Sequence, residues 1–148
     1  MIAAVAAVIV QDKHGRILAV RTGSGGAWRL PGGRVKPGEK PTEVAIREAV
    51  QVLGVPRSTG ALVALGWQAA EAGDELLFIF DGGLVERVPP PAAGTRDVEV
   101  GYFTLYELVD LIPAHRRSMA TAAIDALRSA RPVYVEGDLS VHEFAWPL

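Results

Sequence analysis

A capped amphipathic helix behind a loop rich in glycine and proline constrains the fold of this chain more than any other feature. The helix is predicted from Pro41 to Leu53, because proline suits the first helical position and Gly54 supplies the usual stop. Four apolar residues recur there at helical spacing: Ile46, Ala49, Val50 and Leu53. We expect this face of the helix to lie against the core.

Strand-like segments lie on both sides of this helix. A segment rich in valine, isoleucine and alanine at residues 2–10 is followed by its predicted hairpin partner at 16–21. Further strands are predicted at 61–68, 75–85 and 99–104, a second long helix at 114–130 and a last hairpin at 133–144. Strands before, between and after two helices predict one mixed sheet covered by helices. The last hairpin offers an edge through which two copies could pair as a homodimer.

Length and composition limit the classes of protein that the chain can belong to. Its 148 residues are enough for one domain, and a hydrophobic share of 49% is enough for a core. A net charge of −2 argues against non-specific nucleic-acid binding, which needs a basic surface. The apolar stretch at residues 2–10 is too short to cross a bilayer and follows no basic segment, so we expect a cytoplasmic protein without membrane contact.

Charged residues and glycines recur at fixed spacing across the predicted helix. The six positions of this pattern are Gly33, Glu39, Arg47, Glu48, Gly54 and Val55. The spacing resembles the signature box of the Nudix hydrolase family, which falls here at residues 33–55. The preceding residues 28–33, with the sequence Trp-Arg-Leu-Pro-Gly-Gly, also resemble the segment that leads into that box.

The resemblance implies a single Nudix-type domain over residues 1–148, with an α/β/α sandwich built on a mixed sheet. It also implies hydrolysis of a pyrophosphate linkage in a small nucleoside diphosphate derivative. Such a reaction usually uses Mg²⁺ or Mn²⁺, since a divalent cation screens the phosphate charges and lowers the pKa of a bound water. Mg²⁺ prefers oxygen ligands such as carboxylates.

The chain departs from the family pattern at two positions of the helix. The family places carboxylates at i, i+3 and i+4, where one helix face carries all three. Here these positions hold Glu48, Gln51 and Val52, so two of the three carboxylates are missing. The resemblance then implies that a weakly held cation is bound by four residues: Glu48, Glu39, Gln51 and Glu99. Glu99 lies on a later strand. It assigns catalysis to Glu48, Glu99 and Arg47, with Arg47 orienting the glutamates.

The resemblance assigns substrate binding to Gly32, Gly33, Trp28 and Arg21. Trp28 could stack on a base or pack under the loop, and the residues alone leave both alternatives open. Arg116 and Arg117 could bind a phosphate, but a solvated helix face is the expected role for such a pair.

Two functions are compatible with this altered box. The first is a Nudix-type hydrolase of weak or atypical activity that recruits a carboxylate from another strand. The alternative is a non-catalytic Nudix-fold module that binds a nucleotide or regulates a partner after losing its metal site. The substrate cannot be read from the sequence, because oxidised nucleoside triphosphates, ADP-ribose and nucleotide sugars all fit the box.

Overall fold

The computed structural model describes residues 2–23, 25–55, 57–86, 98–137 and 139–141. These residues form three helices: α1 (Pro41–Leu53), α2 (Leu105–Leu111) and α3 (Ala114–Ser129). The strands are β1 (Ala3–Asp12), β2 (Ile17–Thr22), β3 (Gly32–Arg34), β4 (Leu62–Ala70), β5 (Gly73–Val85), β6 (Val98–Phe103), β7 (Val133–Glu136) and β8 (Leu139–Val141). The predicted hairpin of β1 and β2 and both predicted long helices are present. Residues 142–144 of the predicted last hairpin lie outside the described residues.

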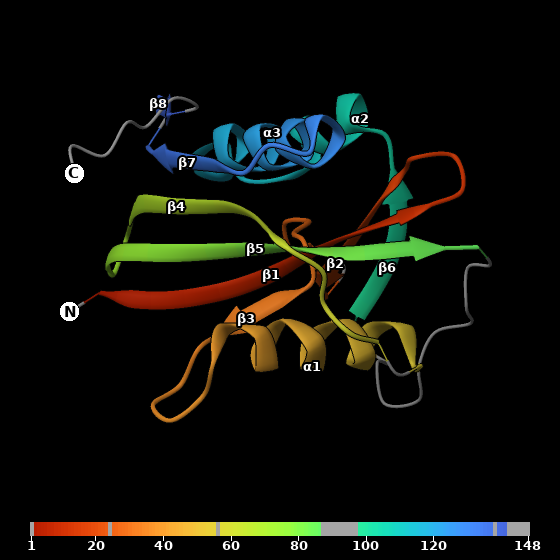
Figure 1. The fold of residues 1–148 in the computed structure, drawn as a ribbon, viewed down its shortest axis with the longest axis horizontal. Helices are drawn as coiled ribbons and strands as arrows, with labels where there is room; N and C mark the ends of the chain where they lie inside the picture. The colour runs from red at the N-terminus through yellow and green to blue at the C-terminus, as the bar shows by residue number, and fades with distance from the viewer. Residues whose placement is uncertain (1, 24, 56, 87–97, 138, 142–148) are drawn as a thin grey trace.

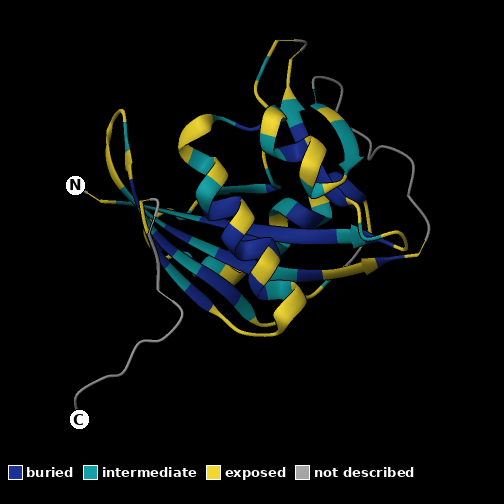
Figure 2. Cartoon of the chain, turned by 90° about the horizontal axis from the view of Figure 1, so that it is seen from above, coloured by how far each residue is buried: buried dark blue, intermediate teal, exposed yellow. Residues whose placement is uncertain are grey.

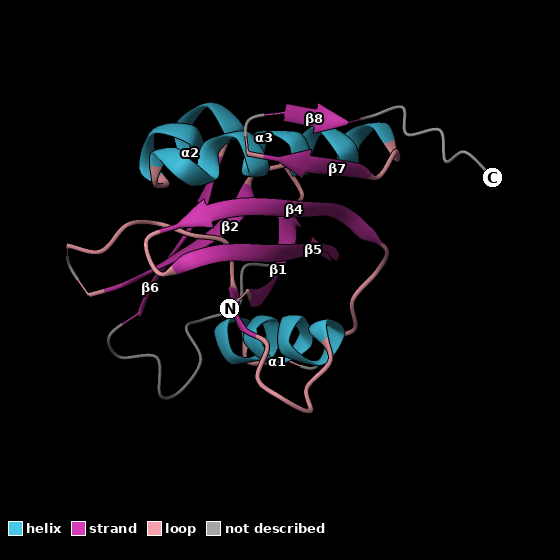
Figure 3. Cartoon of the chain, turned by 90° about the vertical axis from the view of Figure 1, so that its left-hand side faces the viewer, coloured by secondary structure: helices cyan, strands magenta, loops and turns pink. Residues whose placement is uncertain are grey.

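The strands form one mixed sheet in the order β6-β2-β1-β5-β4-β7-β8, with β3 paired to the free part of β1. The β1–β5 and β4–β7 pairs are parallel, and the remaining pairs are antiparallel. Helix α1 covers one face of the sheet, whereas α2 and α3 cover the other (Figures 1 and 3). This arrangement confirms the α/β/α sandwich with a mixed sheet. The homodimer through β7 and β8 stays a prediction.

Strand β1 supplies side chains to both halves of the core because successive residues of a strand point to opposite faces. Ala6, Val8 and Val10 pack into the cluster under α1, whereas Ala7 and Ile9 pack into the cluster under α3. Figure 2 shows the buried residues running along the strands of the sheet. The centre of the sheet is therefore apolar on both faces.

Helix α1 begins and ends where the sequence predicts, but its buried face differs from the prediction. Pro41 occupies the first turn, and Gly54 closes the helix in the left-handed conformation with φ of 72°. The buried residues are Val44, Ala45, Ala49, Val52 and Leu53. The expected core positions Ile46 and Val50 are only half-buried. Ala49 and Leu53 are buried as predicted, and Val52, which was not among the predicted core positions, also lies in the core.

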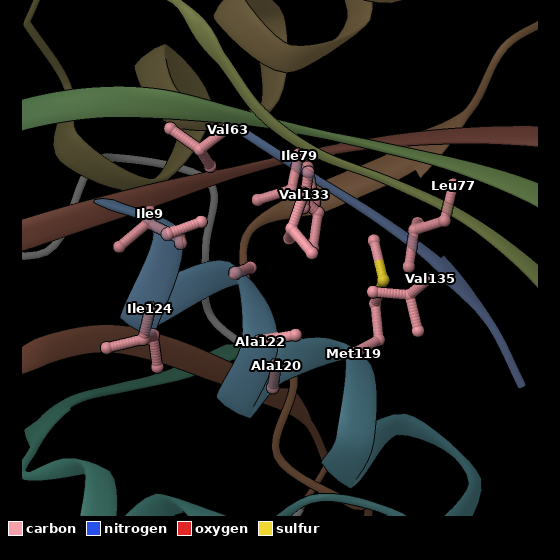
Figure 4. Packing of buried hydrophobic residues seen from close by; sticks show 14 of the residues in the cluster. Ile9, Val63, Leu77, Ile79, Met119, Ala120, Ala122, Ile124, Val133 and Val135 are labelled. Carbon is pink, nitrogen blue, oxygen red and sulfur yellow. The ribbon is translucent and has the colours of Figure 1, made fainter. Parts of the chain in front are cut away.

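On the opposite face, α3 packs against β4, β5 and β7. Met119 and Ile124 of this helix lie among Leu77, Ile79 and Val135 of the strands (Figure 4). Gly66 of β4 leaves space for the Met119 sulfur, which would lie 2.5 Å from a Cβ at that position. Among the described residues, no helix combines the length and apolar character needed to cross a membrane.

A buried carboxylate closes the turn between β1 and β2. The Asp12 side chain is 4% exposed and accepts hydrogen bonds from the backbone N–H groups of His14 and Arg16 and from Arg16 Nε, the last at 2.7 Å. Burial raises the pKa of Asp12, but these hydrogen bonds outweigh it and hold the pKa below the ordinary carboxyl value.

We expect Asp12→Asn to lower the free energy of unfolding by about 2 kcal/mol at pH 7, because charge-assisted hydrogen bonds at a buried carboxylate are lost. Because the pKa of Asp12 is lower in the folded protein, its ionised carboxylate stabilises the fold at pH values above the ordinary carboxyl pKa. This stabilisation is lost as the pH falls through the pKa of the folded state. Urea denaturation between pH 7 and pH 3 should therefore show that the difference in free energy of unfolding between wild type and variant becomes smaller as the pH falls. A gap that stays constant over this range would contradict the assignment.

Gln68 on β4 is a buried polar residue, 3% exposed, and neither atom of its amide has a hydrogen-bond partner among the described residues. An unsatisfied buried group costs about 1–3 kcal/mol, and an apolar side chain of similar shape avoids this cost. Gln68→Met should therefore raise the free energy of unfolding of the free protein by about 1 kcal/mol. Thermal and urea denaturation check this, and a lower midpoint would show that the amide is satisfied in solution.

Candidate active site

The predicted box folds as strand β3, a loop and helix α1, and it brings Glu48 against the backbone of Gly33. Gly33 pairs with Ala6 of β1, and a Cβ at Gly33 would lie only 2.9 Å from Glu48 Oε1. The Glu48 side chain is 21% exposed. A glycine is required at position 33 for this approach, so the first glycine and the helical glutamate of the box form one local structure.

Glu39 and Arg47 connect the loop to the helix. Arg47 Nη1 donates to Glu39 Oε2, and the Lys36 backbone N–H donates to Glu39 Oε1 at 2.9 Å. The Lys36 backbone hydrogen bond and the Arg47 side chain hold the pKa of Glu39 below its ordinary value. The hydrogen bond to Glu39 in turn raises the pKa of Arg47. Arg47 Nε also lies 3.7 Å from Glu48 Oε1, so the three charged residues of the box form a chain with Arg47 between the two carboxylates.

The two altered positions of the box differ in their surroundings. Gln51 is exposed, whereas Val52 is 8% exposed and belongs to the apolar cluster under α1. Glu39 is hydrogen-bonded to Arg47, whereas Arg47 approaches Glu48 only to 3.7 Å. In the part of the chain that the structure describes, no group of three or more His, Asp or Glu side chains is arranged to hold a metal ion. One carboxylate and one exposed amide do not make a site for a resident Mg²⁺ or Mn²⁺.

Glu99 lies in a second cluster with Arg21 and Trp28. Arg21 and Glu99 are paired residues of β2 and β6, and Arg21 Nε and Nη2 donate to Glu99 Oε2 at 3.0 and 2.8 Å. The Arg21 guanidinium lies 4.9 Å from the centre of the Trp28 ring, and the same ring packs edge-on against Phe103 at a centroid distance of 4.8 Å. The structure therefore brings together three residues predicted for the site, but it pairs Glu99 with an arginine.

A cavity of about 680 Å³ lies between the sheet and helices α2 and α3. Its walls include apolar side chains such as Val5, Leu77 and Met119, and its lining includes Trp28, Gly32 and Gly33. Three of the four residues predicted to bind substrate thus line one cavity, and the fourth, Arg21, stacks on Trp28. Gly33 lines this cavity and also lies beside Glu48, which helix α1 carries on the other face of the sheet (Figure 1).

The expectation that Arg116 belongs to a solvated helix face is wrong. Arg116 lines the cavity and donates from Nη2 to Glu75 Oε2 at 2.5 Å, whereas its neighbour Arg117 is exposed. The signal was present in the helical spacing, because Arg116 lies three residues before the buried Met119 and therefore on the same face. Sequence reasoning missed it because the partner carboxylate is 41 residues away.

Comparison with known proteins identifies relatives of the chain. A sequence model of the NUDIX domain matches residues 1–122. A protein of Bacillus subtilis (strain 168) named "Putative 8-oxo-dGTP diphosphatase" is 31% identical over 115 residues, which cover 76% of this chain and 74% of that protein. A "MutT-like protein" of Streptomyces ambofaciens is 28% identical over 125 residues, with coverage of 77% and 80%. The crystal structure of a MutT protein from Methanosarcina mazei Go1 is similar in fold, with a TM-score of 0.71 at 21% identity over 88% of this chain and 96% of that chain.

Proposed function

Because this chain belongs to the NUDIX family of pyrophosphohydrolases, we propose that it hydrolyses a pyrophosphate linkage in a nucleoside diphosphate derivative bound in the cavity beside Trp28. The observation that carries the proposal is the position of Glu48. Its carboxylate lies beside Gly33, a residue whose backbone also borders the cavity on the other face of the sheet, and apart from Arg47 at 3.7 Å the described residues offer it no ion-pair partner. A partly exposed carboxylate of this kind can accept a proton from a water.

The proposed reaction uses Glu48 as the general base. A water oxygen forms a bond to one phosphorus while the bridging P–O bond breaks, and the water proton passes to the Glu48 carboxylate. The bridging oxygen leaves with the second group and takes a proton from solvent. Arg47 orients Glu48 and keeps Glu39 in place, and Arg21 holds Glu99 beside Trp28. Glu99 is a second candidate base if substrate draws Arg21 away to its phosphates.

The chain's own carboxylates do not fit a resident cation, so we propose that Mg²⁺ or Mn²⁺ comes with the substrate on its phosphates. Mg²⁺ commonly binds through one or two carboxylates together with substrate phosphates. Glu48, with the Gln51 amide at i+3, is then a weak additional ligand. Weak holding of the cation is consistent with an atypical, slow hydrolase.

The alternative is a nucleotide-binding or regulatory module without catalysis. The burial of Val52 favours it, since the position that carries a metal-binding carboxylate in the family pattern serves the core here. Both candidates use the same cavity, and they differ only in whether the bound nucleotide is cleaved. A cytoplasmic location remains a prediction for either.

The experiment that separates them is a cleavage assay on purified protein with Mg²⁺ or Mn²⁺. The panel contains the common nucleoside triphosphates, 8-oxo-dGTP because of the name of the Bacillus relative, ADP-ribose and a nucleotide sugar. The proposal expects products cut between two phosphorus atoms, resolved by ion-exchange chromatography. Binding of a nucleotide without any cleavage would reject the hydrolase in favour of the module.

Gln51→Glu should strengthen the binding of Mn²⁺ to the free protein about tenfold, because it adds a carboxylate one turn from Glu48 on an exposed position. Isothermal titration calorimetry of both proteins with MnCl₂ measures this change. Glu71→Gln, at an exposed turn between β4 and β5, is the control for a change in surface charge. Equal affinity in wild type and variant would show that Glu48 does not face a cation position.

A further inference from the structure

Two arginines on the rim of the cavity have no acidic partner. Arg29 and Arg34 are exposed, and both line the cavity on either side of Gly32. No ion pair joins either of them to a carboxylate among the described residues. Three other arginines near the site each form an ion pair with a glutamate: Arg21, Arg47 and Arg116. Because a guanidinium stays charged, the two rim arginines carry positive charges that their neighbours do not compensate.

The backbone of β3 keeps the two rim arginines close together. Arg29 Nη1 donates to the carbonyl oxygens of Leu30 and Gly32 at 3.5 and 3.2 Å, which places its guanidinium beside the first residue of β3. Arg34 is two residues further along the same strand, so it shares a sheet face with Gly32 at a spacing of about 7 Å. Arg29 Nε and Nη2 donate to no acceptor among the described residues and are available to a ligand.

The charges on the cavity rim suit an anion and not a cation. Helix α1 lacks two of the carboxylates that the family pattern places there. Within the cavity, the charge of Arg116 is compensated by Glu75, which leaves the charges of Arg29 and Arg34. A phosphate site lined by carboxylates needs a cation between protein and phosphate, whereas guanidinium groups bind phosphate oxygens directly. The site has therefore exchanged acidic for basic side chains.

Both faces of the sheet can be reached at the edge of β3. This strand pairs with β1 on one side, and no strand of the described residues pairs with its other side. Gly33 lies beside Glu48 on the face that α1 covers, whereas Arg34 lines the cavity on the opposite face (Figure 1). A phosphate group held by the arginines at this open edge can therefore approach Glu48.

We propose that Arg29 and Arg34 bind the diphosphate group of the substrate directly, with no cation between protein and phosphate. Each guanidinium presents a planar fork of N–H donors that matches two phosphate oxygens. The inference rests on the proposed function in taking a diphosphate as the ligand. It separates the binding of the phosphates, which needs no cation, from their cleavage.

Calorimetric titration of the whole chain with methylenediphosphonate tests the proposal. The two phosphonate groups of this probe are joined by carbon, so it has no P–O–P bond to cleave, and it carries no base. In EDTA the anion keeps its full charge, whereas Mg²⁺ neutralises part of it. We therefore expect the affinity in EDTA to equal or exceed the affinity in Mg²⁺, and to fall as NaCl is added. A site that holds the phosphates through a cation shows the reverse order.

Two variants and a matched control assign this binding to the rim arginines. Arg29→Met and Arg34→Met should each weaken binding of the probe in EDTA about tenfold, because each loses charge-assisted hydrogen bonds. Arg34→Lys, which keeps the charge but not the fork, should recover part of the affinity. Arg117→Met removes an exposed arginine outside the cavity lining and should bind as the wild type does. Both rim arginines are exposed, so all variants should keep the wild-type melting temperature.

Binding that requires Mg²⁺ would overturn the inference and leave the hydrolase standing. Binding in EDTA that neither methionine variant weakens would also overturn it, since the anion would then lie elsewhere. No binding of the probe under either condition would overturn it together with the phosphate position. Binding in EDTA without cleavage of any nucleotide in the substrate panel would reject the hydrolase alone.

Discussion

Replacing Glu48 with glutamine is expected to lower kcat for pyrophosphate cleavage by at least about 100-fold. Glutamine keeps the size of the side chain but cannot accept a proton from the attacking water, and loss of a general base costs about 10²–10⁴ in rate. The fold should tolerate the change, because Glu48 is partly exposed and its contact with Arg47 is long at 3.7 Å. Steady-state kinetics on the best substrate of the cleavage panel measures the effect.

Glu71→Gln provides the control, since Glu71 lies at an exposed turn outside the cavity lining. It should retain wild-type kcat and KM. If Glu48→Gln lowers kcat by less than threefold, Glu48 is not the general base of the reaction. In that case Glu99→Gln, measured in the same assay, tests the second candidate base.

Alanine at Gly32 and at Gly33 is expected to have opposite consequences. A Cβ at Gly32 would lie 2.6 Å from the Ala6 carbonyl oxygen and 2.8 Å from the Ala7 Cβ, and Gly32 is the residue of β3 that pairs with Ala7. The backbone of β1 cannot shift there without strain. Gly32→Ala should therefore lower the free energy of unfolding by about 3 kcal/mol. A Cβ at Gly33 meets only the end of the Glu48 side chain, which can rotate away.

Gly33→Ala should therefore keep most of its stability and lose activity, by about 100-fold, because a displacement near 1 Å of a reacting group has this effect. Urea denaturation and steady-state kinetics on both variants separate the two outcomes. Full activity in a folded Gly33→Ala protein would contradict a role in the reaction for the contact between Glu48 and Gly33. Wild-type stability of Gly32→Ala would contradict the β1–β3 register.

The arrangement of the fold followed from local signals in the sequence. Pro41 and Gly54 gave the bounds of α1 correctly, because the first-turn proline and the left-handed stop act within a few residues. The prediction of which residues of α1 are buried was correct only in part. Ala49 and Leu53 are buried as expected, but Val44, Ala45 and Val52 are buried in place of Ile46 and Val50.

The partners of the site residues could not be predicted in the same way. Arg21 and Glu99 are 78 residues apart, and Glu75 and Arg116 are 41 apart, so both pairs exist only through the sheet order and the placement of α3. The sequence indicated Gln51 and Val52 as departures from the family pattern. Only the packing of Val52 into the core explains why that position does not carry a free carboxylate.

The most direct test of the central claim, that Glu48 at Gly33 directs water onto a pyrophosphate bond, is isotope incorporation. The wild type is incubated with the substrate panel and Mg²⁺ in H₂¹⁸O, and the phosphate products are weighed by mass spectrometry. We expect one ¹⁸O atom in one of the two products, at a rate far above that of Glu48→Gln. No labelled product above the Glu48→Gln background, for any nucleotide that binds, would contradict the claim.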